Sequence, residues 1–403
     1  MFPKLRFKEF DENWKEVTLK NCITSIDSGW SPQCESYPAN SSEWGVLKTT
    51  SVDWSGFNSS FNKKLPLELT PRKEIEVKPL DILVTRAGPT ERVGVVSVVP
   101  HSVRSKLMIS DKLIRLKSNE ENNPLFLGIS LSSVKCQNQL QSKTSGLAKS
   151  QTNISQKILG EVLLKLPSKE EQTKIASFLS AVDEKISQLT KKHELLSQYK
   201  QGMMQKLFSQ QLRFKADDGS EFREWEEKEL KDIAEINPKS KKLPESFIYI
   251  DLESVEKGKL LLQKNIELQD APSRAQRLLA KGDVLFQMVR PYQQNNYYFN
   301  LSGEYVASTG YAQIRTKLDS KFIYYALHEK TFLDEVMNRC TGTSYPAINS
   351  SDLSSIEILI PCLEEQTKIA NFLSSIDQKI EVVAQQIEQA KQWKKGLLQQ
   401  MFI

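Results

Sequence analysis

Two polar loops carry the residues that are best suited to chemistry. The first runs from Thr85 to Arg92 after the apolar stretch 80–84, and the second runs from Gln287 to Tyr297 after the similar stretch 282–286. Arg, Gln and Asn side chains carry paired hydrogen-bonding groups that match base edges in the DNA major groove, whereas Lys and Thr more often contact phosphates. The two loops therefore predict nucleic-acid contact, although polar loops of unrelated sequence are also typical of surface segments that vary freely.

Turns built from small residues extend this candidate surface. The stretches 144–146 (Thr-Ser-Gly) and 341–344 (Thr-Gly-Thr-Ser) each precede the last apolar run of their half of the chain. The candidate DNA-contacting residues are polar or aromatic and come from these loops and turns or from one further basic site. They are Lys48, Thr49, Thr85, Arg86, Thr90, Arg92, Ser145, Gln287, Arg290, Tyr292, Gln293, Asn295, Asn296, Thr343 and Ser344.

No catalytic motif accompanies these loops in the sequence. It contains no GxxxxGK[ST] phosphate loop, no GxGxxG after a strand, no HExxH and no GxSxG. Asn237-Pro238 is followed by Lys-Ser and not by the Pro-aromatic pair of an amino-methyltransferase motif, and the three histidines stand apart from one another. The sequence therefore predicts a chain that is not itself an enzyme and that holds no catalytic residue, cofactor or metal.

Composition bounds the class of protein. The 403 residues are 39% hydrophobic and 26% charged, which is typical of a globular chain with more than one core. The net charge of +5 is too weak to establish a nucleic-acid binder by itself. Five cysteines without CxxC spacing indicate free thiols in a reducing cytoplasm, and no apolar run reaches the length of a membrane span.

Two similar stretches follow the loops in sequence and must position them. Residues 167–208 and 361–402 align without a gap, and each opens with the same heptapeptide, EEQTKIA, at 170–176 and 364–370. Apolar residues then recur at alternating steps of four and three, the a/d pattern of a coiled coil. Each helix needs a partner for this apolar stripe, and the nearest partner is the other copy. The residues predicted to pair the helices are Ile175, Leu179, Val182, Ile186, Leu189, Lys200, Ile369, Leu373, Ile376, Ile380, Val383 and Lys394.

Two lysines interrupt this apolar seam at matching places. Lys200 and Lys394 are either tolerated polar positions or residues that fix the register of the helices, since polar seam residues lower stability but specify alignment. Antiparallel pairing about the midpoints of the two stretches would place Lys200 near Ala370 and Lys394 near Ala176.

Each long helix closes a block of short β-rich runs. The predicted division is 1–166 and 210–360 for the two blocks, and 167–209 and 361–403 for the two helices. Short runs such as 81–84 and 283–286 indicate strands. A short helix is expected in each block, at 124–139 and 320–338.

These features together resemble the specificity (S) subunit of Type I restriction-modification enzymes. The resemblance rests on the duplicated EEQTKIA-x-FL helix starts, the proline before each, the strand-plus-loop of each block and the small-residue turn upstream of the last strand. It implies two target recognition domains that each read one half of a split, asymmetric site in double-stranded DNA. The implied fold is two α/β (α+β) domains separated by a long antiparallel two-helix coiled coil with an internal pseudo-twofold repeat.

The same resemblance implies partner subunits. Two modification (methyltransferase) subunits, which bring S-adenosylmethionine, would dock on the paired helices, and restriction (endonuclease/translocase) subunits would bring ATP and Mg. The twelve helix-pairing residues are accordingly expected to serve subunit docking as well. Two other readings stay open: a coiled-coil adaptor with two protein-binding domains, and a nuclease with an unfamiliar motif.

Overall fold

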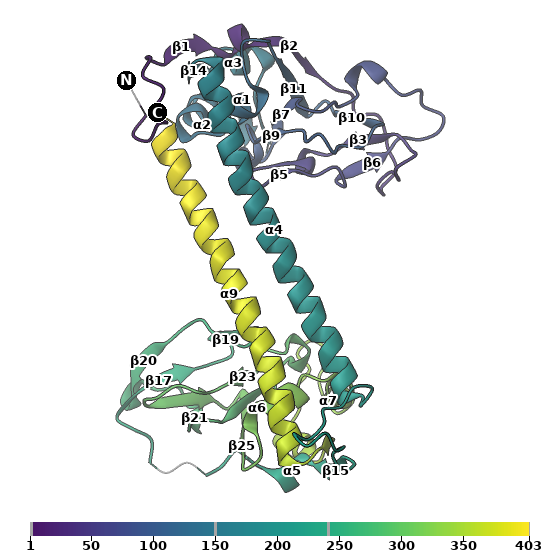
Figure 1. The fold of residues 1–403 in the computed structure, drawn as a ribbon, viewed down its shortest axis with the longest axis vertical. Coiled ribbons are helices and arrows are strands. Elements are labelled where there is room, and N and C mark those ends of the chain that lie inside the picture. The colour runs from purple at the N-terminus through teal and green to yellow at the C-terminus, as the bar shows by residue number, and fades with distance from the viewer. Residues whose placement is uncertain (1–2, 149–150, 240–241, 403) are drawn as a thin grey trace. The chain divides into compact units, whose positions relative to one another are not determined.

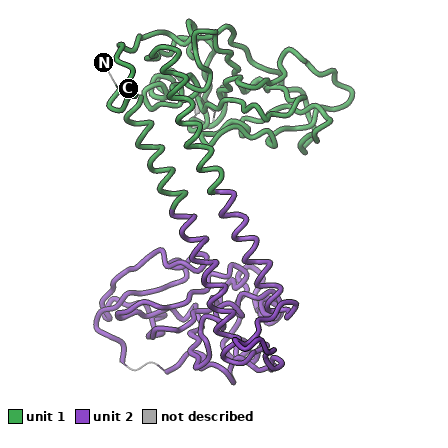
Figure 2. The backbone as a smooth tube through the Cα atoms, in the orientation of Figure 1, with its two compact units in different colours: residues 1–189, 386–403 green, residues 190–385 purple. Residues whose placement is uncertain are grey.

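The computed structural model describes residues 3–148, 151–239 and 242–402. These residues form two compact units, one made of 1–189 with 386–403 and the other of 190–385 (Figure 2). We call them unit 1 and unit 2. Each contains one α/β domain and part of each of two long helices, α4 (Lys169–Phe208) and α9 (Leu363–Met401) (Figure 1).

The two long helices pair in an antiparallel sense. Unit 1 holds the first part of α4 with the last part of α9, and unit 2 holds the last part of α4 with the first part of α9. Apolar seam residues are buried in both units, as the heptad pattern predicted: Leu179 with Leu397 in unit 1, and Leu207 with Leu373 in unit 2. Two glutamates in the first turn of each helix favour its start through the helix dipole.

The rings of Phe178 and Trp393 pack edge to face with their centroids 5.9 Å apart, and the predicted midpoint register would place Phe178 opposite Gln392. This contact agrees with the predicted register. Lys200 Nζ lies 2.6 Å from a carboxylate oxygen of Asp377, and Lys394 Nζ lies 2.5 Å from one of Asp183. Side chains in a helix lean toward its N-terminus, and a lysine reaches several ångströms along the axis, so these ion pairs do not displace the predicted neighbours Ala370 and Ala176. The proximity of these alanines to the two lysines stays a prediction.

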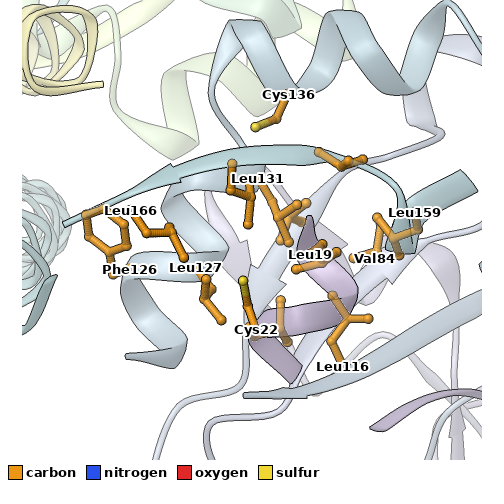
Figure 3. Close-up of a cluster of buried hydrophobic side chains, with 14 of the residues drawn as sticks. Leu19, Cys22, Val84, Leu116, Phe126, Leu127, Leu131, Cys136, Leu159 and Leu166 are labelled. Carbon is orange, nitrogen blue, oxygen red and sulfur yellow. The ribbon is translucent and has the colours of Figure 1, made fainter. Parts of the chain in front are cut away.

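Unit 1 is built on an antiparallel sheet in the order β2-β11-β7-β9, beside a smaller sheet in the order β10-β3-β6. Apolar side chains from the larger sheet, its covering helices and α4 form one core, part of which is shown in Figure 3. The backbone amide of Leu5 donates to the carbonyl of Gln400, which ties the first residues to α9. The strands are β1 (Lys15–Thr18), β2 (Ile23–Ser28), β3 (Gly45–Leu47), β4 (Val52–Asp53), β5 (Gly56–Phe57), β6 (Asn62–Lys64), β7 (Ile82–Thr85), β8 (Ala87–Gly88), β9 (Val96–Val98), β10 (Leu107–Met108), β11 (Leu113–Ser118), β12 (Ser145–Ala148), β13 (Gln151–Asn153) and β14 (Leu163–Leu166), and the helices are α1 (Pro124–Leu131), α2 (Val134–Gln141) and α3 (Gln156–Gly160).

Unit 2 repeats this plan. Its sheet β16-β25-β22-β23 matches the larger sheet of unit 1, and the strand pairs β3/β10 and β17/β24 are both parallel. The repeat confirms the predicted fold class of two α/β domains joined to an antiparallel helix pair. The strands are β15 (Glu226–Glu229), β16 (Ala234–Ile236), β17 (Ser246–Ile250), β18 (Val255–Glu256), β19 (Lys259–Leu260), β20 (Lys264–Glu267), β21 (Ala275–Leu278), β22 (Val284–Gln287), β23 (Tyr297–Tyr298), β24 (Tyr305–Ser308), β25 (Tyr311–Thr316) and β26 (Glu357–Ile360), and the helices are α5 (Leu230–Ile233), α6 (Ser320–Ala326), α7 (Lys330–Asn338) and α8 (Ser350–Ser354).

Each predicted short helix is in fact two helices. In unit 1 the break falls at Ser133, whose side chain accepts from the amide of Cys136 and so caps α2. In unit 2 it falls at Glu329, whose side chain caps α7. A side-chain cap satisfies the free amides of a new helix start, which apolar periodicity alone does not reveal. Within residues 3–148, 151–239 and 242–402, no helix combines the length and the apolar composition needed to span a membrane.

Candidate nucleic-acid interface

A buried aspartate sets the start of the strand that leads into each candidate loop. Asp81 precedes β7 and accepts from the amide of Lys78 at 2.8 Å, and Asp283 precedes β22 and accepts from the amide of Ala280 at 2.7 Å. Arg315 on β25 donates twice to Asp283, at 2.8 Å each. Burial raises the pKa of the Asp81 carboxyl. The two strands therefore start in the same way. The candidate loops follow equivalent strands in the two domains.

In unit 2 the structure brings the two predicted segments together. The amide of Arg290 donates to the carbonyl of Pro346 at 2.7 Å, and Val289 forms an antiparallel bridge with Ala347. The guanidinium of Arg290 lies over the ring of Tyr345, 4.1 Å from its centre. Loop 287–297 and turn 341–347 thus form one continuous surface with a stacked Arg–Tyr pair at its centre.

Tyr345 is a candidate that the sequence interpretation missed. Its side chain is 64% exposed, and that of Tyr292 on the neighbouring loop is 50% exposed. An exposed aromatic ring in a polar loop can stack against bases or support an arginine. The signal available in the sequence was an aromatic residue directly after the Thr-Gly-Thr-Ser turn.

Two predicted contact residues of this loop are buried instead. Asn296 Oδ1 accepts from the amide of Gln287 at 2.9 Å, and Gln287 Oε1 accepts from the amide of Asn295 at 3.0 Å. Gln287 Nε2 also donates to Gln293 Oε1 at 2.9 Å. Because Gln287 and Asn296 are only 2% and 1% exposed, we correct their assignment: they brace the loop from inside.

A buried histidine completes this brace. His328 Nδ1 lies 2.7 Å from the carbonyl of Tyr324, so that nitrogen carries the proton and Nε2 faces the amide nitrogen of Asn296 at 3.4 Å. Burial lowers the pKa of His328 to about 4. The neutral ring therefore serves as an acceptor within the fold at neutral pH.

In unit 1 the corresponding loop is joined to a hairpin. Strand β8, within loop 85–92, pairs with β13, and the hydroxyls of Thr90 and Thr152 are 2.7 Å apart. The amide of Ile154 donates to the carbonyl of Arg86 at 3.0 Å. The predicted residue Ser145 starts β12 on the other strand of this hairpin, but its side chain lies outside the described residues.

Two predicted contact residues of unit 1 have internal roles. Thr85 is fully buried, and its hydroxyl accepts from the amide of Val95 and donates to the carbonyl of Arg92. The guanidinium of Arg92 donates to Asp53 at 2.6 Å and to the carbonyl of Val52 at 2.7 Å. Thr85 is therefore removed from the interface, and Arg92 ties its loop to β4.

The other candidates whose side chains are described, together with Arg92, have side chains that are at least partly exposed. Tyr292, Gln293, Thr343 and Ser344 are exposed, and the others are partly exposed: Lys48, Thr49, Arg86, Thr90, Arg92, Arg290 and Asn295. The described residues contain no group of three or more His, Cys, Asp or Glu arranged to hold a metal ion.

The repeated heptapeptide joins each long helix to its domain. The side chain of its second glutamate, Glu171 or Glu365, is almost fully buried and accepts from an arginine and from a tryptophan indole. The following glutamine side chain accepts from the amide of an N-cap residue, Asn123 of α1 or Asp319 of α6. The second glutamate and the glutamine of the motif therefore make the same structural contacts in both copies.

A family model for the Type I restriction modification DNA specificity domain matches residues 12–197 and 223–392. The chain belongs to this family. The two matched segments cover both units, so both domains are copies of the specificity domain.

Individual relatives agree. The EcoEI specificity subunit of Escherichia coli is 40% identical over 171 residues, which are 42% of this chain and 29% of that subunit. The MjaVIII specificity subunit of Methanocaldococcus jannaschii is 28% identical over 81% of this chain and 79% of its own length. The crystal structure of an S subunit from M. genitalium covers 100% of this chain and 99% of its own, with a TM-score of 0.64 at 17% identity. This structural likeness shows the same fold over the whole length.

Proposed function

We propose that this chain is the DNA-specificity subunit of a Type I restriction-modification enzyme, and that each domain reads one half of a split, asymmetric site. The observation that carries the proposal is the pairing, in both units, of the loop after β7 or β22 with a second polar segment. The strands and helices that support the loops correspond in the two domains, whereas the side chains of the loops differ. Two equivalent frames with different loops are suited to reading two different sequences.

In unit 2 the stacked Arg290–Tyr345 pair is the centre of the proposed contact. An arginine held over an aromatic ring loses less side-chain freedom when it binds, and its donors suit guanine O6 and N7. Gln293 is the second base-edge candidate on this loop. Thr343 and Ser344 are placed to meet phosphate oxygens. In unit 1, Arg86 is assigned to base edges, and Lys48, Thr49 and Thr90 to the backbone.

Docking of partner subunits is assigned to outer residues of the long helices. The predicted seam residues such as Leu179 and Leu373 are fully buried between the helices and their domains, so their role is pairing. Large apolar side chains on the other faces are exposed by 51–54%: Leu195, Tyr199, Val382 and Trp393. Exposed apolar groups of this kind are typical of protein–protein contacts.

We assign the chemistry to those partners and none to this chain. Two modification subunits would bring S-adenosylmethionine for adenine methylation, and restriction subunits would use ATP and Mg for translocation and cleavage. The five cysteines are free thiols, which is consistent with a cytoplasmic complex.

Methylome sequencing tests the proposal. A host that carries this chain with its modification subunit should gain methylated adenines in a single bipartite motif. The matched control is the same host with a chain that lacks only the proposed base contacts, Arg290→Ala with Gln293→Ala. If the complex assembles on the long helices but no sequence-specific methylation appears, the chain is better explained as a coiled-coil adaptor with two protein-binding domains.

A further inference from the structure

Unit 1 contains a cavity of about 850 Å³, and none of the residues proposed above to contact DNA lines it. It lies between α1 and β9 on one side and α4 and α9 on the other, and the turn between β4 and β5 closes a third side. A volume of this order is typical of small-molecule sites. The surface is mixed: apolar residues such as Leu179 and Leu398 alternate with serine, aspartate and lysine side chains.

Unit 2 shows what fills the same place in the other copy. Helices α1 and α6 correspond because their N-cap residues, Asn123 and Asp319, bond to the same glutamine of the repeated heptapeptide. Counted from these caps, Ile129 of α1 stands where α6 has Tyr325. Ile129 lines the cavity, whereas Tyr325 is only 4% exposed in the core of unit 2.

The ring of Tyr325 is held by three side chains of the long helices. Its hydroxyl lies 2.7 Å from Asp377 Oδ2 and 3.3 Å from Ser374 Oγ. Lys200 Nζ lies over the ring, 5.1 Å from its centre. The carboxylate accepts the phenol proton and the ammonium group packs on the aromatic face, so this is a complete binding site for a phenol.

Unit 1 has the same three groups without the phenol. Asp183, Ser180 and Lys394 occupy the matching positions of the repeated helices, and all three line the cavity. The neighbouring ring of unit 2 is missing too, since Gly128 replaces Tyr324. A Cβ at Gly128 would lie 2.4 Å from Cγ2 of Val98, so a larger side chain there would require the Val98 side chain to move.

The cavity also differs from its counterpart in charge. Lys391 and Lys395 line it, where the corresponding positions of α4 hold Ser197 and Gln201. Lys135 adds a third basic side chain. Trp54, which is 49% exposed, contributes an aromatic face to the lining. The site therefore favours a negatively charged group beside the phenol position.

We propose that this cavity binds a small phenolic anion. The ring takes the place that Tyr325 fills in unit 2, the hydroxyl donates to Asp183, and the anionic group meets Lys391 or Lys395. This ligand site is additional to DNA recognition and does not depend on it.

The test is a calorimetric titration of the full chain with 4-hydroxyphenylacetate. Two matched compounds dissect the binding: phenylacetate lacks the hydroxyl, and tyramine keeps the phenol but carries a positive charge. A hydrogen bond to a charged acceptor contributes enough that phenylacetate should bind at least about tenfold more weakly. Tyramine should also bind more weakly. Undetectable binding of 4-hydroxyphenylacetate, or equal binding of phenylacetate, would overturn the proposal.

Variants locate the site. Ile129→Tyr supplies the missing ring from the chain itself and should abolish binding while raising Tm. Asp183→Asn keeps the shape of the cavity and should weaken binding about tenfold, so it tests the site if the first variant folds poorly. The reciprocal change, Tyr325→Ile, removes the phenol ring from unit 2 and should lower Tm. Added 4-hydroxyphenylacetate should bind in the space left by the ring and restore part of that loss in Tm. Unchanged affinity in both Ile129→Tyr and Asp183→Asn excludes the cavity as the binding place.

Discussion

Arg213 donates two hydrogen bonds to the buried carboxylate of Glu365, from Nε at 3.2 Å and from Nη2 at 2.9 Å. Trp225 Nε1 donates to the same carboxylate at 3.1 Å. Arg6, Trp14 and Glu171 repeat the arrangement in unit 1. In each unit this contact fixes the start of a long helix to the first residues of its domain.

Removing the arginine should destabilise its unit strongly. Arg213→Met leaves the Glu365 charge buried without its ion-pair partner, which typically costs about 3–5 kcal/mol. Hydrogen exchange of the core strands β22 and β25 measures this loss in unit 2. Glu364→Gln, a change of the exposed neighbouring glutamate, is the matched control and should alter stability by less than about 1 kcal/mol. Equal effects of the two changes would contradict the role of the contact.

The observed helix register can be tested by exchanging charges. Lys200→Glu places two carboxylates together at Asp377 and should destabilise the helix pair by about 1 kcal/mol, because the site is partly exposed. Adding Asp377→Lys should restore most of the loss, as measured by thermal unfolding. A double variant that is no more stable than Lys200→Glu alone would contradict this contact.

Stability should fall with acid because His328 is buried neutral. Its pKa is about 4 in the folded chain, against an ordinary value of 6.5. As pH falls from about 6.5 towards 4, His328 is protonated in the unfolded state but stays neutral in the folded state. The free energy of unfolding therefore declines by up to about 3 kcal/mol. His328→Gln should remove this part of the decline in urea unfolding at pH 7 and pH 4.5. His101→Gln, at an exposed position, should leave the decline unchanged.

Loop substitutions should act on one half of the DNA site at a time. Arg290→Ala should lower discrimination at the half read by unit 2 by about 1–3 kcal/mol and leave the other half unchanged. Arg86→Ala should do the reverse. Binding of the assembled complex to DNA pools randomised in one half-site measures both. Uniform weakening across all sequences would reassign these arginines to phosphate contact.

The long helices could be predicted from the sequence because their signal is local. Apolar residues repeat every heptad through 175–207 and 369–401, and this pattern is enough to define a paired helix. The ion-pair partner of each seam lysine could not be found in the same way, because the a/d pattern does not show how far a lysine side chain reaches along the facing helix. The contact of Lys200 with Asp377 joins residues far apart in sequence.

The sequence identified the segments of the candidate site better than its individual residues. It placed loop 287–297 and the turn at 341–344 in one candidate surface, and the structure brings these two segments together. Which polar side chains turn inward could not be predicted, because burial of Thr85 and Gln287 depends on partners supplied by the folded backbone. Tyr345 was overlooked because only its contact with Arg290 distinguishes it from other surface aromatics.

The contacts of the repeated heptapeptide have a consequence for how such chains diversify. The residues of the helix starts that attach each domain, among them Glu171, Gln172, Glu365 and Gln366, lie outside the loops that differ between the two domains. One whole domain can therefore be exchanged for another without altering the joint, provided that the incoming domain carries the arginine, the tryptophan and the N-cap residue that bond to the heptapeptide. Because the heptapeptide is the same in both copies, either helix start can hold a domain that carries these partners. New combinations of half-sites can then arise by shuffling intact domains, with no intermediate that has lost its fold.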